Sequence, residues 1–244
     1  MISERKEQLS TPRVLNIGFD LDGVLANLKS PLGERFLDYG VDINMLMWQK
    51  LQASVPIPFD FGDWPEVQEA GLTEIFNQML TDESLYLAAE PIRPMVDLVE
   101  HWHQEGHAVF IISSRPQELA QVTQYWLQEV AGLGWFEEEQ LFLNPQHPQY
   151  DLGSGFKPGL ARQLKLHLFF EDYFESLLAI DHPEMCLKVL LRYPYNQQAE
   201  ILPGTVSLGS IRPESGGIDL FPEEIQKLKD LVEEIRRRPN VAQY

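Results

Sequence analysis

Two aspartates, Asp20 and Asp22, stand two residues apart directly after an apolar run that begins at Val14. Gly23 follows them and allows a tight backbone turn. A short apolar run ended by turn residues is typical of a buried strand in a parallel sheet, and open α/β sheets bind ligands where their strands end. Two carboxylates at that edge repel each other unless a cation or a shared proton intervenes. Since hard cations take oxygen ligands, the pair favours a Mg²⁺ site.

The same pair also has a purely structural interpretation, because Asp and Gly are common turn residues. The other predicted strands distinguish the two interpretations. Apolar runs at residues 107–112 and 167–170 are each followed at once by polar side chains. Because all carboxyl ends of a parallel sheet share one edge, these side chains are expected to converge on one crevice. The residues expected there are Asp20, Asp22, Ser113, Ser114, Glu171 and Asp172, with Lys157 close by.

The remaining periodicity places these residues on a sheet with helices between its strands. Apolar residues recur at helical spacing over residues 95–102, 119–126 and 225–235. Strands are expected at 14–19, 107–112, 141–143, 167–170 and 187–191. Strands that alternate with helices predict βαβ units and therefore a parallel sheet.

Residues 28–90 have a different character and contain no convincing strand. Short helices are expected near residues 32–39 and 45–48, and one longer helix over residues 67–80. We therefore predict a core of residues 14–27 and 91–244 with a helical cap at 28–90, placed over the strand ends as such insertions usually are. Phe59, Phe61 and Trp64 could stack on a ligand from the cap, although packing within the cap is the more common use of aromatic residues.

The motif order resembles the haloacid-dehalogenase-like (HAD) phosphohydrolases. It consists of DLDGVLA, a strand that ends in IISSRP, a lysine, and a strand that ends in FFED, together spanning roughly residues 14–181. The inserted segment resembles a cap of the C1 type. The stretches WPEV, GHAVFIISSRP and YPYN are most similar to the 5′-nucleotidase branch, which includes deoxyribonucleotidases.

This resemblance implies a Rossmann-like parallel sheet flanked by helices, with the helical cap inserted after the first strand. It also implies a role for each residue of the edge. Asp20 would attack the phosphoryl group, and Asp22 would act as general acid and base. The phosphate would be held by Ser113, Ser114 and Lys157, and Mg²⁺ by Asp20, Asp22 and Asp172, with Glu171 as a possible ligand.

Two assignments stay open at this point. Lys165 competes with Lys157 because it lies closer in sequence to the fourth strand, although Lys157 begins its helix and can face the crevice. Arg115 could reach the substrate or could pair with one of the many surface acids. His101 and His103 do not form a zinc pair, because helix positions i and i+2 face different directions.

The chemistry of these residues is consistent with phosphomonoester hydrolysis. A carboxylate nucleophile divides the reaction into two displacements through an aspartyl-phosphate, and a second carboxylate can protonate the leaving alcohol. We expect a Mg²⁺-dependent phosphatase of a small phosphorylated metabolite, with a nucleoside monophosphate as the leading substrate. The alternatives are a sugar- or other small-metabolite phosphatase, and a regulatory protein that binds metal and phosphate without turnover.

Composition limits the other functions of this 244-residue chain. Its 37 acids and 19 Lys and Arg give a formal net charge of −18, which disfavours nucleic acid as a partner. No apolar run approaches the roughly 18 residues of a membrane span, and residues 1–13 lack the apolar core of a signal peptide. With Cys186 as the single cysteine, we expect a packed thiol and a cytoplasmic protein. The oligomeric state is left open.

Overall fold

The computed structural model describes residues 13–145, 155–182, 185–197, 199, 204–211 and 218–237. The first twelve residues, on which most of the signal-peptide expectation rests, lie outside this part of the chain. Among the described helices, none combines the length and the apolar composition that crossing a bilayer requires.

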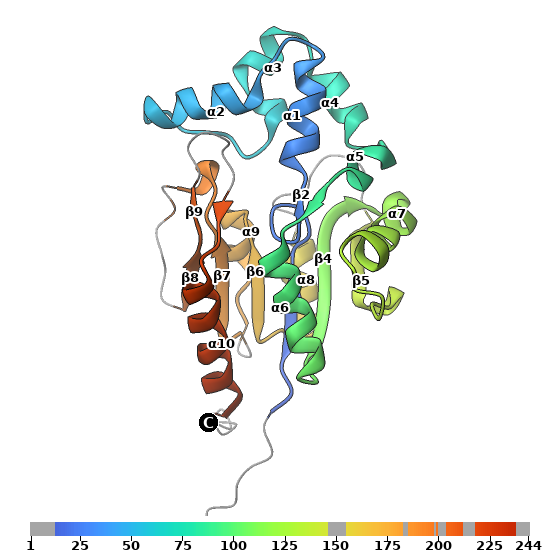
Figure 1. Cartoon of the computed structure of the whole chain (residues 1–244), viewed down its shortest axis with the longest axis vertical. Coiled ribbons are helices and arrows are strands. Elements are labelled where there is room, and N and C mark those ends of the chain that lie inside the picture. The colour runs from blue at the N-terminus through green and yellow to red at the C-terminus, as the bar shows by residue number, and fades with distance from the viewer. Residues whose placement is uncertain are drawn as a thin grey trace, which may run out of the picture.

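A six-stranded sheet in the order β5-β4-β1-β6-β7-β8 forms the centre of the molecule (Figure 1). Every neighbouring pair in it is parallel. Its strands are β1 (Asn16–Phe19), β4 (Ala108–Pro116), β5 (Leu141–Asn144), β6 (Leu168–Glu171), β7 (Leu187–Leu191) and β8 (Thr205–Leu208). The chain builds outward from β1 through β4 to β5, then crosses back to β6 on the other side of β1. Such a reversal of strand order leaves a crevice at the carboxyl ends.

The predicted fold class is confirmed, with two differences in the strands. The strand β8 was not predicted, because only Leu208 of its four residues is buried and no apolar run marks this edge of the sheet. The strand β4 continues past residue 112 as far as Pro116. Ser113 and Ser114 are therefore part of the strand and do not belong to the loop after it.

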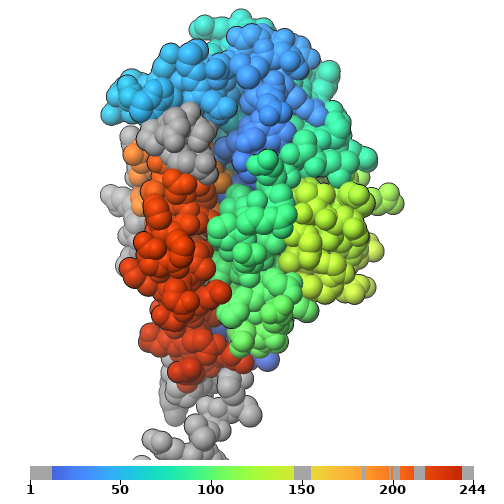
Figure 2. Space-filling model, in the orientation of Figure 1, coloured from blue at the N-terminus to red at the C-terminus, as the bar shows by residue number. Residues whose placement is uncertain are grey.

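Helices cover both faces of the sheet, and the alternation of strand residues assigns them. On β6, Leu168 and Phe170 join one apolar cluster, whereas Phe169 points to the other face and joins a second cluster. The first cluster includes residues of α6 (Arg93–Gln104) and α10 (Pro222–Arg237), and the second includes residues of α8 (Phe156–Gln163) and α9 (Phe174–Ala179). Figure 2 shows α6 and α10 side by side on one face.

The helical segment between the first two long strands lies above the carboxyl edge of the sheet (Figure 1). Its helices are α1 (Lys29–Leu37), α2 (Ile43–Gln52), α3 (Pro65–Glu69), α4 (Thr73–Met79) and α5 (Glu83–Leu87). Two short antiparallel strands, β2 (Ala26–Asn27) and β3 (Glu90–Pro91), pair where the chain enters and leaves this segment.

The prediction of one helix over residues 67–80 was wrong. The chain forms α3 and α4 instead, with Gly71 between them at a φ of 69°. A glycine in the left-handed region ends a helix, because its backbone turns away from the helical path without steric cost. The apolar spacing continues across this break, which explains why the pattern resembles one helix.

The prediction of a packed thiol at Cys186 was also wrong, because this side chain is exposed. Cys186 immediately precedes β7, and the next residue, Leu187, takes the buried position that begins the strand. Side chains alternate along extended backbone, so the neighbour of a buried residue faces outward.

The helix α10 offers a test of this packing. Its buried residues Leu228, Val232 and Ile235 belong to the main apolar cluster. We expect Leu228→Ala to lower the free energy of unfolding by about 2–5 kcal/mol, because it removes buried methyl groups and leaves a cavity. Denaturant unfolding measures this change. The exposed neighbour Lys227→Ala is the matched control and should alter stability by less than about 0.5 kcal/mol. Equal effects of the two substitutions would contradict docking of α10 on the core.

Candidate active site

Asp20 lies directly after β1, buried at the middle of the carboxyl edge. Its backbone N–H donates to the carbonyl of Phe170 at 2.8 Å, and the residue is 5% exposed. The Lys157 ammonium lies 2.9 Å from Asp20 Oδ1 and 2.7 Å from Glu171 Oε2, so one cation bridges two buried carboxylates. Burial, with a further contribution from Glu171, raises the pKa of Asp20 to about 8 despite the opposing effect of Lys157.

Glu171 and Asp172 at the end of β6 differ in how their oxygens are used. Glu171 Oε2 accepts from Lys157, and Oε1 accepts the backbone N–H groups of Asp172 and Tyr173 at 3.1 and 3.2 Å. Asp172 Oδ2 accepts from the hydroxyl of Tyr195. Asp172 Oδ1 is buried and has no hydrogen-bond partner among the described residues. Burial and the charge of Asp20 raise the pKa of Asp172 to about 6.

These three acids form a set of oxygen donors that fits a hard cation. One carboxylate oxygen each from Asp20, Glu171 and Asp172 lies within 4.8 Å of the others. An unpartnered, buried Asp172 Oδ1 would carry a desolvation cost, which a bound cation would remove. Oxygen donors of this kind suit Mg²⁺. Because both oxygens of Glu171 already accept hydrogen bonds, Asp172 is the better placed ligand.

The structure separates the two candidate lysines. Lys157 lies in the first turn of α8, is 7% exposed and points into the acid cluster. Lys165 lies beyond the other end of α8 and is exposed. Its carbonyl accepts from the side chain of Asn16, at the start of β1. Lys165 is therefore at the opposite edge of the sheet from Asp20.

Asp22 is held by Arg115, so the arginine does pair with an acid, and its contact with the substrate stays a prediction. Arg115 is 2% exposed, and its Nε and one terminal nitrogen donate to the two oxygens of Asp22 at 2.8 and 2.6 Å. Its other terminal nitrogen donates to the Thr123 hydroxyl at 3.2 Å. The guanidinium also lies 4.2 Å from the centroid of the Tyr86 ring, which comes from α5. Arg115 thus pairs with the second acid of the motif, and this carboxylate is not one of the surface acids.

Ser113 and Ser114 occupy different environments although they are neighbours on β4. Ser113 is 1% exposed, and its hydroxyl oxygen accepts the backbone N–H of Arg115 at 3.2 Å. Its hydroxyl proton can therefore be donated to a ligand at the edge. Ser114 is half-buried, on the alternate side of the strand.

Gly23, in the first motif, lies directly beside the acid cluster. Its φ is 85°, a conformation that favours glycine. A Cβ built on Gly23 would overlap Asp172 Oδ2. The DLDG sequence therefore supplies two acids and also the space that a third acid occupies.

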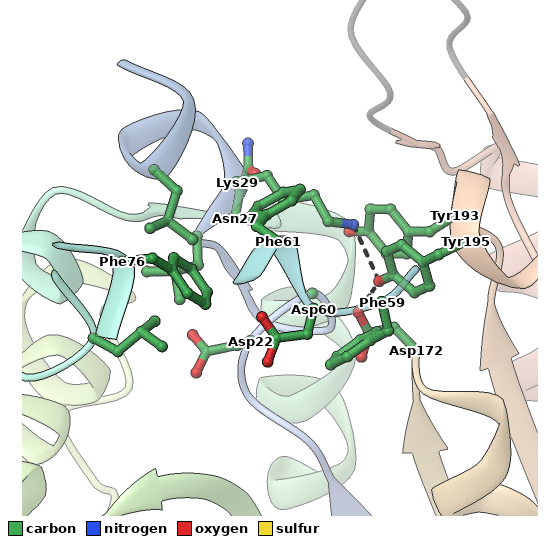
Figure 3. A pocket seen from close by; sticks show the side chains of 14 residues that line it. Asp22, Asn27, Lys29, Phe59, Asp60, Phe61, Phe76, Asp172, Tyr193 and Tyr195 are labelled. Atoms are coloured by element: carbon green, nitrogen blue, oxygen red, sulfur yellow. Dashed lines mark hydrogen bonds between the residues drawn. The ribbon is translucent and has the colours of Figure 1, made fainter. Parts of the chain in front are cut away.

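A pocket opens from this edge towards the helices above it (Figure 3). Its empty volume, open mouth included, is about 650 Å³. Asp22 and Asp172 lie at its floor, and most of the remaining lining is apolar or aromatic. The side chains that line it include Asn27, Leu28, Lys29, Leu32, Phe59, Asp60, Phe61, Phe76, Leu80, Tyr193 and Tyr195.

The three aromatic residues singled out in the helical segment have separate roles. Trp64 is fully buried and packs against Phe61, with ring centroids 5.2 Å apart. Phe61 is 6% exposed and reaches the pocket wall from this packing. Phe59 lines the pocket and contacts the rings of Tyr173 and Tyr195 at 4.5 and 4.9 Å.

Sequence reasoning did not assign Lys29, Tyr86, Thr123, Tyr195 or Asn196 to the site. The YPYN segment entered only through the family resemblance, although its place directly after the strand at residues 187–191 was a usable signal, since strand ends meet at this edge. Lys29 and Tyr86 lie in irregularly patterned sequence between predicted elements, and no spacing connects them to the motifs.

Comparisons with known proteins agree with this architecture. No protein-family model matches the chain. A Bacillus cereus protein named "Putative nucleotidase" is 26% identical over 161 residues, which are 65% of this chain and 76% of that protein. A Thermotoga maritima structure described as a "putative beta-phosphoglucomutase" is 13% identical, with 89% of this chain and 100% of that chain covered and a TM-score of 0.53. A haloacid dehalogenase-like family hydrolase from Streptococcus pneumoniae is 15% identical, with coverages of 82% and 95% and a TM-score of 0.48.

The fold belongs to the α/β class, and the acids of the site lie where the strand order of the sheet reverses. This is the fold that the motif resemblance to the haloacid-dehalogenase-like phosphohydrolases implied. The narrower resemblance to 5′-nucleotidases stays a prediction.

The raised pKa of Asp20 predicts how stability depends on pH when metal is absent. Folded Asp20 holds its proton up to about pH 8, whereas its ordinary pKa is 3.8. The folded state therefore binds more protons than the unfolded state over this range, and the free energy of unfolding falls as pH rises. Asp20→Asn should flatten this fall between about pH 5 and pH 8. Denaturant unfolding with a chelator present measures it.

The exposed acid Asp38 provides the matched control for this experiment. Asp38→Asn removes one negative charge of the same kind from the surface of the helical segment above the sheet. It should keep the parental pH dependence. Parallel curves for the parent and Asp20→Asn would contradict the assigned cause.

Proposed function

We propose that this protein is a Mg²⁺-dependent phosphomonoester hydrolase that acts through an aspartyl-phosphate on Asp20, with a nucleoside monophosphate as its substrate. The observation that carries the proposal is the position of Asp20. This buried carboxylate lies beside the cation of Lys157 and the unpartnered oxygen of Asp172, and Asp22 stands two residues away at the floor of an open pocket. A structural turn has no need for this combination of charges.

Each residue at the carboxyl edge of the sheet would have its own role in the reaction. Asp20 would attack phosphorus, forming one P–O bond while the bond to the leaving alcohol breaks. Ser113 and Lys157 would donate hydrogen bonds to the phosphoryl oxygens, where negative charge must be stabilised. When bound by Asp20, Asp172 and the backbone carbonyl of Asp22, Mg²⁺ would offset the repulsion between the phosphate and the carboxylates.

Asp22 would serve both halves of the reaction. It would give a proton to the leaving oxygen in the first step and take one from water in the second, when that water attacks phosphorus and releases Asp20. The bidentate contact with Arg115 orients the ionised carboxylate, and the protonated form that the first step needs would give up one of these two hydrogen bonds. Its position on the pocket floor supports this role, because the leaving group must extend from the phosphate into that pocket.

The lining of the pocket supports a nucleoside as the leaving group. Phe59, Phe61 and Phe76 offer aromatic or apolar surface, and Asn27 and Asp60 add hydrogen-bonding groups among them. A planar base needs both, since its faces stack and its edges form hydrogen bonds. The name of the Bacillus cereus relative, a nucleotidase, agrees with this choice.

A substrate panel tests the proposal directly. The parent should hydrolyse phosphomonoesters only with Mg²⁺ and should prefer nucleoside monophosphates to sugar phosphates. Asp20→Asn should reduce kcat by about 10⁴-fold or more with its fold unchanged, because it removes the nucleophile but keeps the shape. Released phosphate and far-UV circular dichroism are the measurements. Preference for sugar phosphates would support the alternative substrate class, and no hydrolysis of any member would support a regulatory binding protein.

The role of Asp22 predicts a dependence on the leaving group. Asp22→Asn should reduce the hydrolysis of alkyl phosphates by about 10²–10⁴-fold, because an alkoxide needs a proton as it departs. An activated aryl phosphate should lose much less, since its leaving group is stable without one. Steady-state rates on both ester classes provide the comparison. Equal losses would mean that Asp22 is not the general acid.

A further inference from the structure

The carboxylate of Asp172 is constrained on one oxygen and unpartnered on the other. Oδ2 accepts a hydrogen bond from Tyr195, and Oδ1 is buried with no partner in the described part of the chain. The adjacent Glu171 has both oxygens engaged. Oδ1 is therefore the one oxygen of this neighbouring pair that is still available to a cation.

The direction of the Tyr195 hydrogen bond follows from a second donor. Lys29 Nζ lies 3.0 Å from the Tyr195 hydroxyl oxygen and donates to it whenever the amine is protonated, although burial lowers the pKa of Lys29 to about 7. The hydroxyl oxygen therefore accepts from Lys29, and its own proton is available to Asp172 (Figure 3). This chain of donors runs from the first residue of α1 to the end of β6.

Packing holds the Tyr195 ring in place. The ring of Tyr193 stacks on it at 5.4 Å and 6°, and Phe59 meets it edge-on at 4.9 Å. Lys29 Nζ lies over both tyrosine rings, 3.2 Å from the centroid of Tyr193 and 4.2 Å from that of Tyr195. The Tyr195 hydroxyl is therefore held at a fixed position, because its ring has little freedom to move.

Asn196, the residue after Tyr195, fixes the backbone of Asp172. The side-chain amide nitrogen of Asn196 donates to the backbone carbonyl of Asp172 at 2.7 Å and to that of Leu191 at 2.8 Å. On the opposite side, Oδ2 lies so close to Gly23 that a Cβ on this residue would overlap it. Both the main chain and the carboxylate of Asp172 are therefore oriented before any ligand arrives.

We propose that Tyr195 is a positioning residue that presents Asp172 Oδ1 to the metal, and that Lys29 holds Tyr195 in this role. This inference rests on the magnesium site of the proposed function and assigns its outer shell. By occupying Oδ2, Tyr195 makes Asp172 a one-oxygen ligand, which suits the strict octahedral geometry of Mg²⁺. Because Lys29 begins α1, the helical segment above the sheet contributes to the metal site without contacting the ion.

Calorimetric titration of the full chain with Mg²⁺ alone tests this role. Tyr195→Phe keeps the ring and removes only the hydroxyl, and it should raise the Kd for Mg²⁺ by about 10–100-fold, the usual cost of losing an outer-shell partner. Lys29→Met should raise the Kd by less, because the hydroxyl remains. Tyr39→Phe, on an exposed tyrosine, removes a hydroxyl elsewhere and should leave the Kd unchanged.

The melting temperature of each metal-free variant separates positioning from general stability. A hydroxyl that only stabilises the fold would lower this temperature and leave the Kd at the parental value, and this result would overturn the proposal. A parental Kd in Lys29→Met would also remove Lys29 from the chain of donors. Absence of Mg²⁺ binding in the parent would instead contradict the proposed function. If Tyr195→Phe does not fold, Lys29→Met carries the test alone: a raised Kd supports the proposal, and a parental Kd overturns it.

Discussion

The bridge that Lys157 forms between Asp20 and Glu171 is the interaction on which the carboxyl edge depends. Three carboxylates lie within a few ångströms of one another here, all of them buried. Burial makes each ionised acid costly, and every neighbouring acid adds to that cost. Lys157 reaches two of these three carboxylates at once because α8 begins beside the ends of β1 and β6. The placement of this helix is therefore as important to the site as the acids themselves.

Much of the site was predictable because parallel strands impose a common edge. The apolar runs before Asp20, Ser113 and Glu171 identify β1, β4 and β6, and these strands are adjacent in the sheet. Lys157 could be preferred to Lys165 because the start of a helix that follows a strand lies at the carboxyl edge. In each case a local pattern determined the element, and the topology of the sheet brought the residues together.

The contacts that escaped prediction depend on tertiary structure with no local signal. Arg115 pairs with Asp22 across 93 positions of the sequence, and Lys29 contacts Tyr195 across 166. Neither contact arises from a period of 2 or 3.6, so no window of sequence contains it. The break at Gly71 and the edge strand β8 were missed for other reasons. Around Gly71 the apolar pattern was compatible with more than one backbone path, whereas β8 has no apolar run to mark it.

Gly23 meets two requirements that have separate origins. Its positive φ is a property of the main chain, whereas the lack of room beside Asp172 Oδ2 concerns a side chain that lies 149 residues later. Asn and Asp are the usual substitutes for glycine at positive φ, but each would bring a Cβ into the carboxylate. Among the twenty amino acids only glycine satisfies both conditions. A substitution at position 23 would therefore displace the Asp172 carboxylate itself, whereas a substitution at Tyr195 or Lys29 would alter the hydrogen bonds that lead to it.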